Sequence, residues 1–162
     1  MNKILLINRM LGNWIVQSTT YSLFKKNIEA SLNEIKWSLV EDKIQELAYR
    51  KQNIFPINST NMKIYILEKE TNHLQKKIYQ IFLFEKKSKG YIVKLDYNFQ
   101  ILNQSIFYYN SENFLSVYYK SRNNIIIENI YFINDNLKVI KSIIKKNSKC
   151  IGICFSSEIR IN

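Results

Sequence analysis

The feature that most constrains the fold is the run of short β-rich segments that follows Pro56. These segments are rich in Ile, Val, Tyr and Phe, and turns of Asn, Ser, Asp and Lys separate them at hairpin length. The expected strands are 62–69, 74–85, 91–97, 100–109, 114–120, 124–133, 137–145 and 150–161. Because short turns join consecutive strands, the pattern predicts an antiparallel meander.

The N-terminal part of the chain adds two strands and one or two short helices. Residues 13–24 and 28–40 are rich in β-branched and aromatic residues and are expected to be strands. Residues 1–10 favour a short helix. Residues 41–53 favour a second one, with acids at its start and basic residues at its end. About ten up-and-down strands remove their exposed edges by closing, so we expect one all-β domain over residues 1–162, an antiparallel barrel that can enclose a small ligand.

The last expected strand alternates between an apolar face and a polar face. The apolar face carries Ile151, Ile153, Phe155, Ile159 and Ile161. The polar face carries Gly152, Cys154, Ser156, Glu158 and Arg160. The alternation leaves open which face points into the barrel. If the polar face lines a cavity, Glu158 and Arg160 are ligand-binding groups, and if it faces solvent they are a surface pair.

Few residues are available for conventional catalysis. His73 is the only histidine, the 3 glycines build no phosphate-binding loop, and the 13 acidic residues form no tight metal-binding cluster. Cys150 and Cys154 would lie on one strand face about 13 Å apart, too far for a disulfide, and are expected to be small buried residues. The residues therefore favour a barrel that holds a ligand or a partner, and the abundant aromatic side chains suit a flat apolar ligand.

The net charge of +11 favours an acidic partner. Basic charge with interleaved Tyr and Phe is also typical of sheet proteins that stack bases, so an RNA-binding β protein is an alternative. However, the lysines are spread along the chain, and the abundance of Ile, Lys, Asn and Tyr indicates an A/T-rich genome such as that of an organelle. Without an apolar run of about 18 residues, no transmembrane helix is expected. The N-terminus lacks the pattern of a signal peptide.

Two regions carry more specific patterns. The first is GNWIVQSTTY at 12–21. The second comprises ENIYF at 128–132, NLK at 136–138 and CFSSEIRI at 154–161. Together they resemble the S-type phycobiliprotein lyases of the CpcS/CpeS family, which have a G-x-W-x-S-Q-R-T-like strand, E-R-x-W-F followed by N-L-R-x-R, and a terminal S-F-C-S-E-I-R-M. The chain departs from this pattern at two family arginines, which are Ser18 and Ile140 here, and at the family cysteine, which is Ser156.

The resemblance implies a lipocalin-like barrel that binds an open-chain tetrapyrrole (a bilin, such as phycocyanobilin or phycoerythrobilin) as substrate, with no separate cofactor. Such a lyase attaches the bilin by a thioether to a cysteine of an apo-phycobiliprotein subunit, and it works by positioning the reactants. A homodimer or a heterodimer with a related lyase is compatible with the sequence. Neither nucleic acid nor a membrane is an expected partner. The composition suits a plastid-encoded protein of the plastid stroma. A carrier of bilin or another small apolar ligand, without transferase activity, is the first alternative.

The resemblance also implies site residues, position by position. Glu128 and Lys138 are the catalytic candidates, Glu128 to hydrogen-bond the pyrrole nitrogens or assist protonation and Lys138 to pair with a bilin propionate. Tyr131 replaces a family tryptophan and would stack on the tetrapyrrole, and Lys141 or Lys145 would compensate for a lost arginine. The full set of bilin-binding candidates is Trp14, Gln17, Tyr131, Lys141, Ser157, Glu158 and Arg160.

Overall fold

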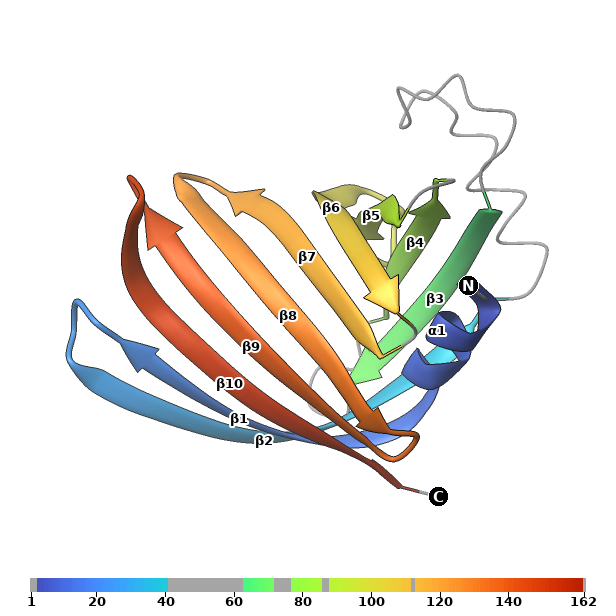
Figure 1. Ribbon diagram of the computed structural model, residues 1–162, viewed down its shortest axis with the longest axis horizontal. Coiled ribbons are helices and arrows are strands. Elements are labelled where there is room, and N and C mark those ends of the chain that lie inside the picture. The colour runs from blue at the N-terminus through green and yellow to red at the C-terminus, as the bar shows by residue number, and fades with distance from the viewer. Residues whose placement is uncertain (1–2, 41–62, 72–76, 86–87, 112, 162) are drawn as a thin grey trace.

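The described strands form a closed antiparallel barrel (Figure 1). A computed structural model describes residues 3–40, 63–71, 77–85, 88–111 and 113–161. Each strand pairs with its neighbours in sequence, and the pairing of the first strand with the last closes the ring. The up-and-down barrel of ten strands expected from the sequence is confirmed.

One helix and ten strands make up the described chain. In order they are α1 (Lys3–Met10), β1 (Gly12–Ser22), β2 (Asn27–Leu39), β3 (Lys63–Thr71), β4 (Ile78–Phe84), β5 (Lys89–Leu95), β6 (Ile101–Ser111), β7 (Phe114–Ser121), β8 (Asn124–Asn134), β9 (Leu137–Lys146) and β10 (Lys149–Ile161). Each expected strand overlaps one of these. The helix expected over 41–53, and His73, lie outside the described residues. No described helix is long and apolar enough to cross a membrane.

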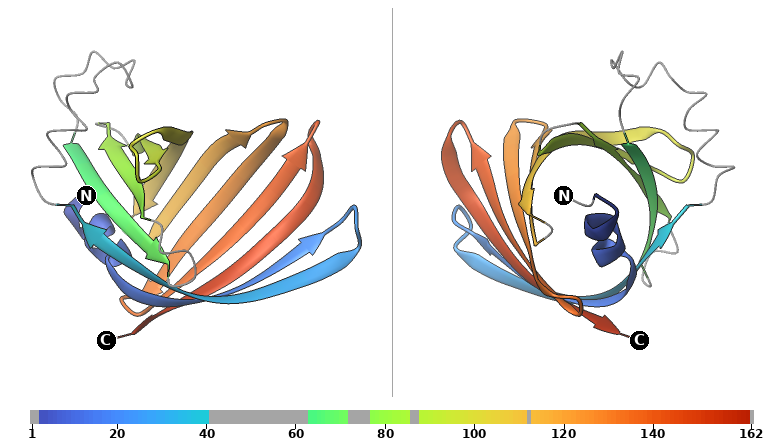
Figure 2. Two further views of the ribbon diagram at one scale, coloured as in Figure 1. Left: turned by 180° about the vertical axis from the view of Figure 1, so that it is seen from behind. Right: turned by 45° about the vertical axis from the view of Figure 1, so that its right-hand side comes forward.

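The wall of the barrel is much longer on one side than on the other. Strands β4 and β5 have 7 residues each, whereas β2 and β10 have 13. The long strands β1, β2 and β8–β10 therefore run past the short ones and flare outward, while the ring closes around α1 at the other end (Figure 2).

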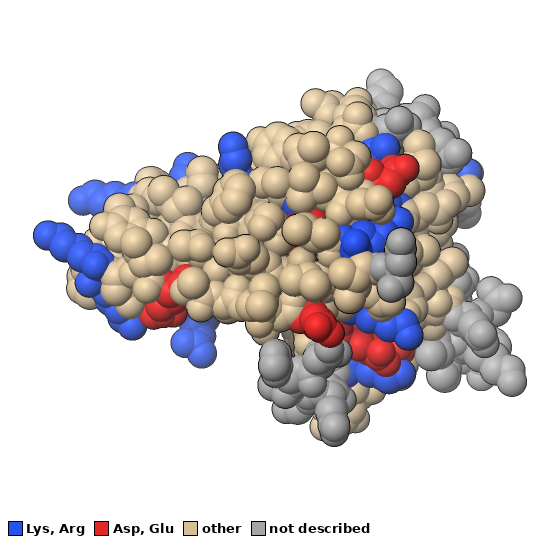
Figure 3. Space-filling model, turned by 90° about the horizontal axis from the view of Figure 1, so that it is seen from below, with Lys and Arg blue, Asp and Glu red and all other residues tan. Residues whose placement is uncertain are grey.

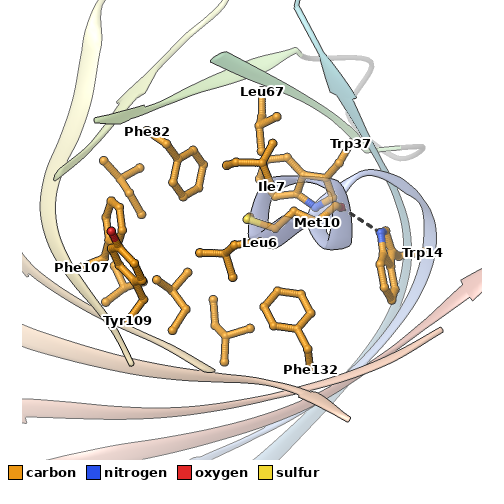
Figure 4. Packing of buried hydrophobic residues seen from close by; sticks show 14 of the residues in the cluster. Leu6, Ile7, Met10, Trp14, Trp37, Leu67, Phe82, Phe107, Tyr109 and Phe132 are labelled. Carbon is orange, nitrogen blue, oxygen red and sulfur yellow. Dashed lines mark hydrogen bonds between the residues drawn. The ribbon is translucent and has the colours of Figure 1, made fainter. Parts of the chain in front are cut away.

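Helix α1 packs inside the barrel because one of its sides is apolar. Leu6, Ile7 and Met10 are almost fully buried and project into the ring of core side chains that includes Leu67 and Phe132 (Figure 4). Full burial of a side chain of this size contributes about 1.5–3 kcal/mol. The helix thus acts as a plug whose apolar side completes the core.

A cluster of aromatic rings fills the wall beside the helix. Phe84 meets Phe107 edge to face at 5.1 Å between ring centroids, and Phe82 lies 5.9 Å from Phe107. Gly90, directly opposite Phe107 on the paired strand, leaves room for that ring. A Cβ atom at Gly90 would lie 2.3 Å from Phe107 Cζ and 2.4 Å from the Leu83 carbonyl oxygen. The glycine is therefore required by close packing.

The polar face of β10 points into the barrel, which settles the question that the alternation left open. Ser156 and Glu158 are buried, whereas Phe155 and Ile159 are about half exposed on the outside. The expectation that both cysteines are buried is wrong: Cys150 is exposed where a register shift interrupts the pairing of β10 with β9, and Cys154 is only partly buried. Seen from below, a broad part of the outer surface is uncharged (Figure 3).

Candidate functional site

The barrel holds a partly open cavity of about 400 Å³, which Met10 at the end of α1 helps to line. This volume is within the range of pockets that hold small-molecule ligands, about 300–1,000 Å³. The apolar residues of its lining are Met10, Ile35, Trp37, Phe82, Ile92, Leu102, Leu115, Val117, Ile130, Phe132 and Ile140. The polar residues are Lys69, Gln80, Lys94, Asn103, Ser105, Tyr119, Glu128, Lys138 and Glu158. An apolar wall with convergent polar groups suits an apolar ligand with polar or charged substituents.

Lys138 and Glu158 form a buried ion pair at the edge of this cavity. They lie opposite each other on β9 and β10, and Lys138 Nζ is 2.7 Å from Glu158 Oε2. Lys138 Nζ also lies 4.1 Å from the centre of a Trp14 ring. Burial lowers the pKa of Lys138, and the neighbouring Glu158 carboxylate opposes that shift. The Lys138 charge is thus matched within the protein.

Trp14 and Arg160 lie between this pair and the helix. The Trp14 Nε1 group donates a hydrogen bond to the Met10 carbonyl oxygen at 3.1 Å, and Arg160 Nη2 donates to the Arg9 carbonyl oxygen at 3.0 Å. The Arg160 guanidinium also lies 4.7 Å from the centre of a Trp14 ring. Both side chains therefore tie the C-terminal end of α1 to the barrel, and neither is among the residues that line the cavity.

Glu128 faces the cavity from β8 and accepts a hydrogen bond from the hydroxyl of Tyr119 on β7, at 3.2 Å. Burial raises the pKa of Glu128, and the Tyr119 hydrogen bond partly offsets this shift. Burial and the nearby carboxylate also raise the pKa of Tyr119. Glu128 is therefore a carboxyl group that can exchange a proton closer to neutral pH than an exposed glutamate does.

Four of the candidates that the sequence suggested lie on the outer face of the barrel. Gln17 is exposed and stands directly opposite Ser157 on the paired strand. Lys141 is exposed, and its Nζ lies 5.6 Å from the centre of the Tyr131 ring. These residues alternate along their strands with inward-facing neighbours, so they do not line the cavity. Motif matching alone does not distinguish the two faces of a strand.

The cavity also contains polar residues that the sequence analysis missed. Tyr119, Lys69 and Lys94 project into it from β7, β3 and β5. A signal was available for Lys94, because a lone lysine interrupts the apolar run from Tyr91 to Leu95. Lys94 shares a strand face with the buried Ile92, two residues before it, so its side chain points to the same side as that core residue. Among the described residues, no group of three or more His, Cys, Asp or Glu side chains is placed to hold a metal ion.

The closed barrel and its lined cavity define a small-ligand-binding β-barrel with a lipocalin-like architecture. Residues 4–161 match the family model described as CpeS-like protein, so the chain belongs to the CpeS-like family. It is 28% identical over 160 residues to a chromophore lyase CpcS/CpeS homolog of Gracilaria tenuistipitata var. liui, covering 96% of this chain and 95% of that relative.

Two solved structures share the fold. The S-type phycobiliprotein lyase CPES from Guillardia theta superposes with a TM-score of 0.67 at 14% identity, covering 100% of this chain and 94% of the other. A DUF3598-family protein of unknown function from Nostoc punctiforme superposes with a TM-score of 0.56 at 11% identity, covering 96% of this chain and 49% of the other. At these identities the two structures establish the barrel architecture.

Proposed function

We infer that this chain is a phycobiliprotein chromophore lyase, which binds a bilin and attaches it to a cysteine of a phycobiliprotein subunit. The observation that carries the inference is membership of the CpeS-like family over residues 4–161. The relative from Gracilaria is itself named a chromophore lyase homolog. The cavity inside the barrel, with its apolar wall and inward charges, supports the binding of such a ligand.

The reaction is an addition and needs no redox partner. The acceptor thiol adds across the exocyclic carbon–carbon double bond of ring A, so a carbon–sulfur bond forms as the π bond is lost, and the thiol proton ends on carbon. The protein contributes mainly by holding the bilin in one conformation and orientation. Positioning of this kind can supply a large part of a rate enhancement without a catalytic triad.

We propose that Glu128 contacts the pyrrole nitrogens of the bound bilin. Its carboxyl oxygens face the cavity and can accept hydrogen bonds from pyrrole N–H groups, and its raised pKa favours its use as a proton donor. Tyr119 orients the carboxyl group through its hydrogen bond. Glu128 is thus the proposed catalytic residue and Tyr119 a positioning residue.

The proposed role of Lys138 is narrower than direct capture of a propionate. A ligand carboxylate would have to compete with Glu158, which already lies 2.7 Å from the ammonium group. We propose that the Lys138–Glu158 pair shapes the end of the cavity, and that Trp14 and Arg160 support it by fixing α1. The outer residues Gln17, Tyr131, Lys141 and Ser157 have no proposed contact with a bilin inside the barrel.

The partners and the location belong to the same proposal. The bilin is the substrate, no further cofactor takes part, and the protein partner is an apo-phycobiliprotein subunit. The A/T-rich composition supports a plastid location. The chain can act alone, as a homodimer or with a related lyase, and the proposal requires none of these in particular.

Absorbance titration of the purified protein with phycocyanobilin and phycoerythrobilin tests the ligand. A saturable red shift with band sharpening is the expected result, because an ordered chromophore absorbs differently from a free one. Spectra identical to those of the free bilins would contradict the proposal and direct attention to RNA binding. Transfer to an added apo-subunit then separates a lyase from a carrier.

A further inference from the structure

Lys69 and Lys94 are two cavity-facing lysines that no described carboxylate contacts at ion-pair distance, although Glu128 and Glu158 lie near enough to act on Lys69 electrostatically. The cavity lining contains three lysines and two glutamates. Lys138 is paired with Glu158, and Glu128 is hydrogen-bonded to Tyr119. Neither Lys69 nor Lys94 forms an ion pair with any carboxylate among the described residues. The positive charge inside the barrel is therefore concentrated at these two side chains.

The two lysines belong to a polar arc that crosses five adjacent strands. Trp37 on β2 stands opposite Lys69 on β3, and the Lys69 ammonium lies 5.4 Å from the centre of a Trp37 ring. Gln80 on β4 stands opposite Lys94 on β5, which stands opposite Asn103 on β6. All five side chains line the cavity. We call these residues the basic arc.

Two members of the basic arc also have unmet hydrogen-bonding capacity. Trp37 is 93% buried, and its buried Nε1 donor has no partner among the described residues. The Asn103 Oδ1 atom is likewise buried and unpartnered. A buried polar group without a partner costs about 1–3 kcal/mol, so a ligand carboxylate that accepts a hydrogen bond from Trp37 Nε1 is favoured, whereas Asn103 Oδ1 needs a donor group of the ligand. Burial lowers the pKa of Lys69, which a ligand anion would reverse.

We propose that the basic arc binds the carboxylates of the ligand, with Lys69 and Lys94 each pairing with one of them. This assignment rests on the proposed function, since a bilin carries two propionate side chains. It also sets the orientation of the chromophore. The propionates face β3 and β5, and the pyrrole nitrogens face Glu128 on β8, across the ring of strands. Ion pairs with a ligand are strong here because the wall is largely apolar.

The test compares bilin free acid with the bilin dimethyl ester, using Lys69→Met, Lys94→Met and the double variant. Methionine keeps the apolar stem of the lysine and removes the charge. We expect each single change to weaken binding of the free acid about 10-fold or more. Binding of the ester should hardly change. The double variant should no longer distinguish acid from ester. Lys120→Met, on the exposed outer face of β7, is the matched control and should bind as the wild type does.

The outcomes separate this assignment from the proposed function. If wild type binds the free acid and the double variant still prefers acid to ester by the wild-type factor, the assignment is overturned while the bilin site stands. If wild type binds no bilin, the proposed function fails and the assignment fails with it. Far-ultraviolet circular dichroism checks folding, and Lys69→Gln and Lys94→Gln repeat the comparison if a methionine variant does not fold.

Discussion

Lys138 and Glu158 form an ion pair inside the barrel, with 2.7 Å between Nζ and Oε2 and almost no exposure to solvent. The two residues face each other across β9 and β10, so the strand register itself holds them together. The pair explains how a lysine in a lysine-rich segment is buried. Because Glu158 already occupies the Lys138 ammonium group, the proposal above assigns the ligand carboxylates to other side chains of the cavity.

Breaking this pair is expected to be costly for stability. Lys138→Met leaves Glu158 buried without its partner, and loss of one member of a buried pair typically costs about 3–5 kcal/mol. The double variant Lys138→Met/Glu158→Leu should recover most of that loss, because no charge is then left uncompensated. Urea denaturation measures the free energy of unfolding of the single and the double variant. An exposed ion pair contributes only about 0–1 kcal/mol. If the free energy of unfolding of Lys138→Met lies within about 1 kcal/mol of that of the wild type, the pair is solvated in solution.

Removing the carboxyl group of Glu128 should affect transfer more than binding. Glu128→Gln preserves shape and removes the acid–base group, so we expect the transfer rate to fall about 100-fold, the usual scale for general acid–base catalysis. The bilin dissociation constant should change by less than about 3-fold, because the apolar wall and the basic arc remain. Equal transfer rates in the variant and the wild type would remove Glu128 from the mechanism.

Tyr119→Phe should shift the pH dependence of transfer. The Tyr119 hydrogen bond lowers the pKa of Glu128, which burial has raised, so its removal lets that pKa rise further. The limb of the pH–rate profile that reports Glu128 is therefore expected at higher pH in the variant. Tyr118→Phe, at an exposed outer position next in sequence, makes the same chemical change away from the cavity. An unshifted limb in Tyr119→Phe, or the same shift in both variants, would contradict the positioning role.

The raised pKa of Glu128 also predicts how stability varies with pH. Above its ordinary value of 4.5 the unfolded chain is ionised at this position, while the folded chain still holds the proton up to its higher pKa. The Glu128 contribution is thus most favourable below pH 4.5 and is lost as pH rises through the folded pKa. Glu128→Gln should remove this loss and be more stable than wild type at neutral pH. Denaturant unfolding of both proteins from pH 4 to 8 checks whether the wild type loses stability relative to Glu128→Gln as the pH rises.

Two glycines provide a matched test of packing in the wall. Gly90→Ala would place a Cβ atom 2.4 Å from the Leu83 carbonyl oxygen, whereas at Gly152 the nearest atom is 3.4 Å away. We expect Gly90→Ala to lower the free energy of unfolding by about 2 kcal/mol or more, as overpacked sites typically do. Gly152→Ala should lower the free energy of unfolding by less than Gly90→Ala does. Equal stability of the two variants would show that the Phe107 region adjusts freely.

The sequence was sufficient to predict the barrel because each strand can be recognised from its own β-rich residues and the polar turns on either side of it. Each segment between polar turns became one strand, and short turns left a meander as the simplest pairing. The orientation of the faces was harder, because β10 carries apolar side chains on one face and polar ones on the other. Phe155 and Ile159 remain about half exposed, so hydrophobicity alone would have pointed the wrong face inward.

The candidate site was predicted in part. Glu128, Lys138 and Glu158 line the cavity as the motif positions suggested, and their proposed roles still require experiments. Gln17 and Ser157 lie outside, because neighbours along a strand point to opposite faces. Lys69 and Lys94 lie on β3 and β5, with β4 between them, and were missed because the family motifs lie outside these strands.

Mass spectrometry of an apo-phycobiliprotein subunit, after incubation with this protein and bilin, tests the central claim most directly. The account predicts that the subunit gains the mass of one bilin at one cysteine, and faster than in a reaction without the lyase. It also predicts that changing the acceptor cysteine to alanine, or using Glu128→Gln, removes most of that gain. A subunit that is modified at the same rate with and without the protein would contradict the account.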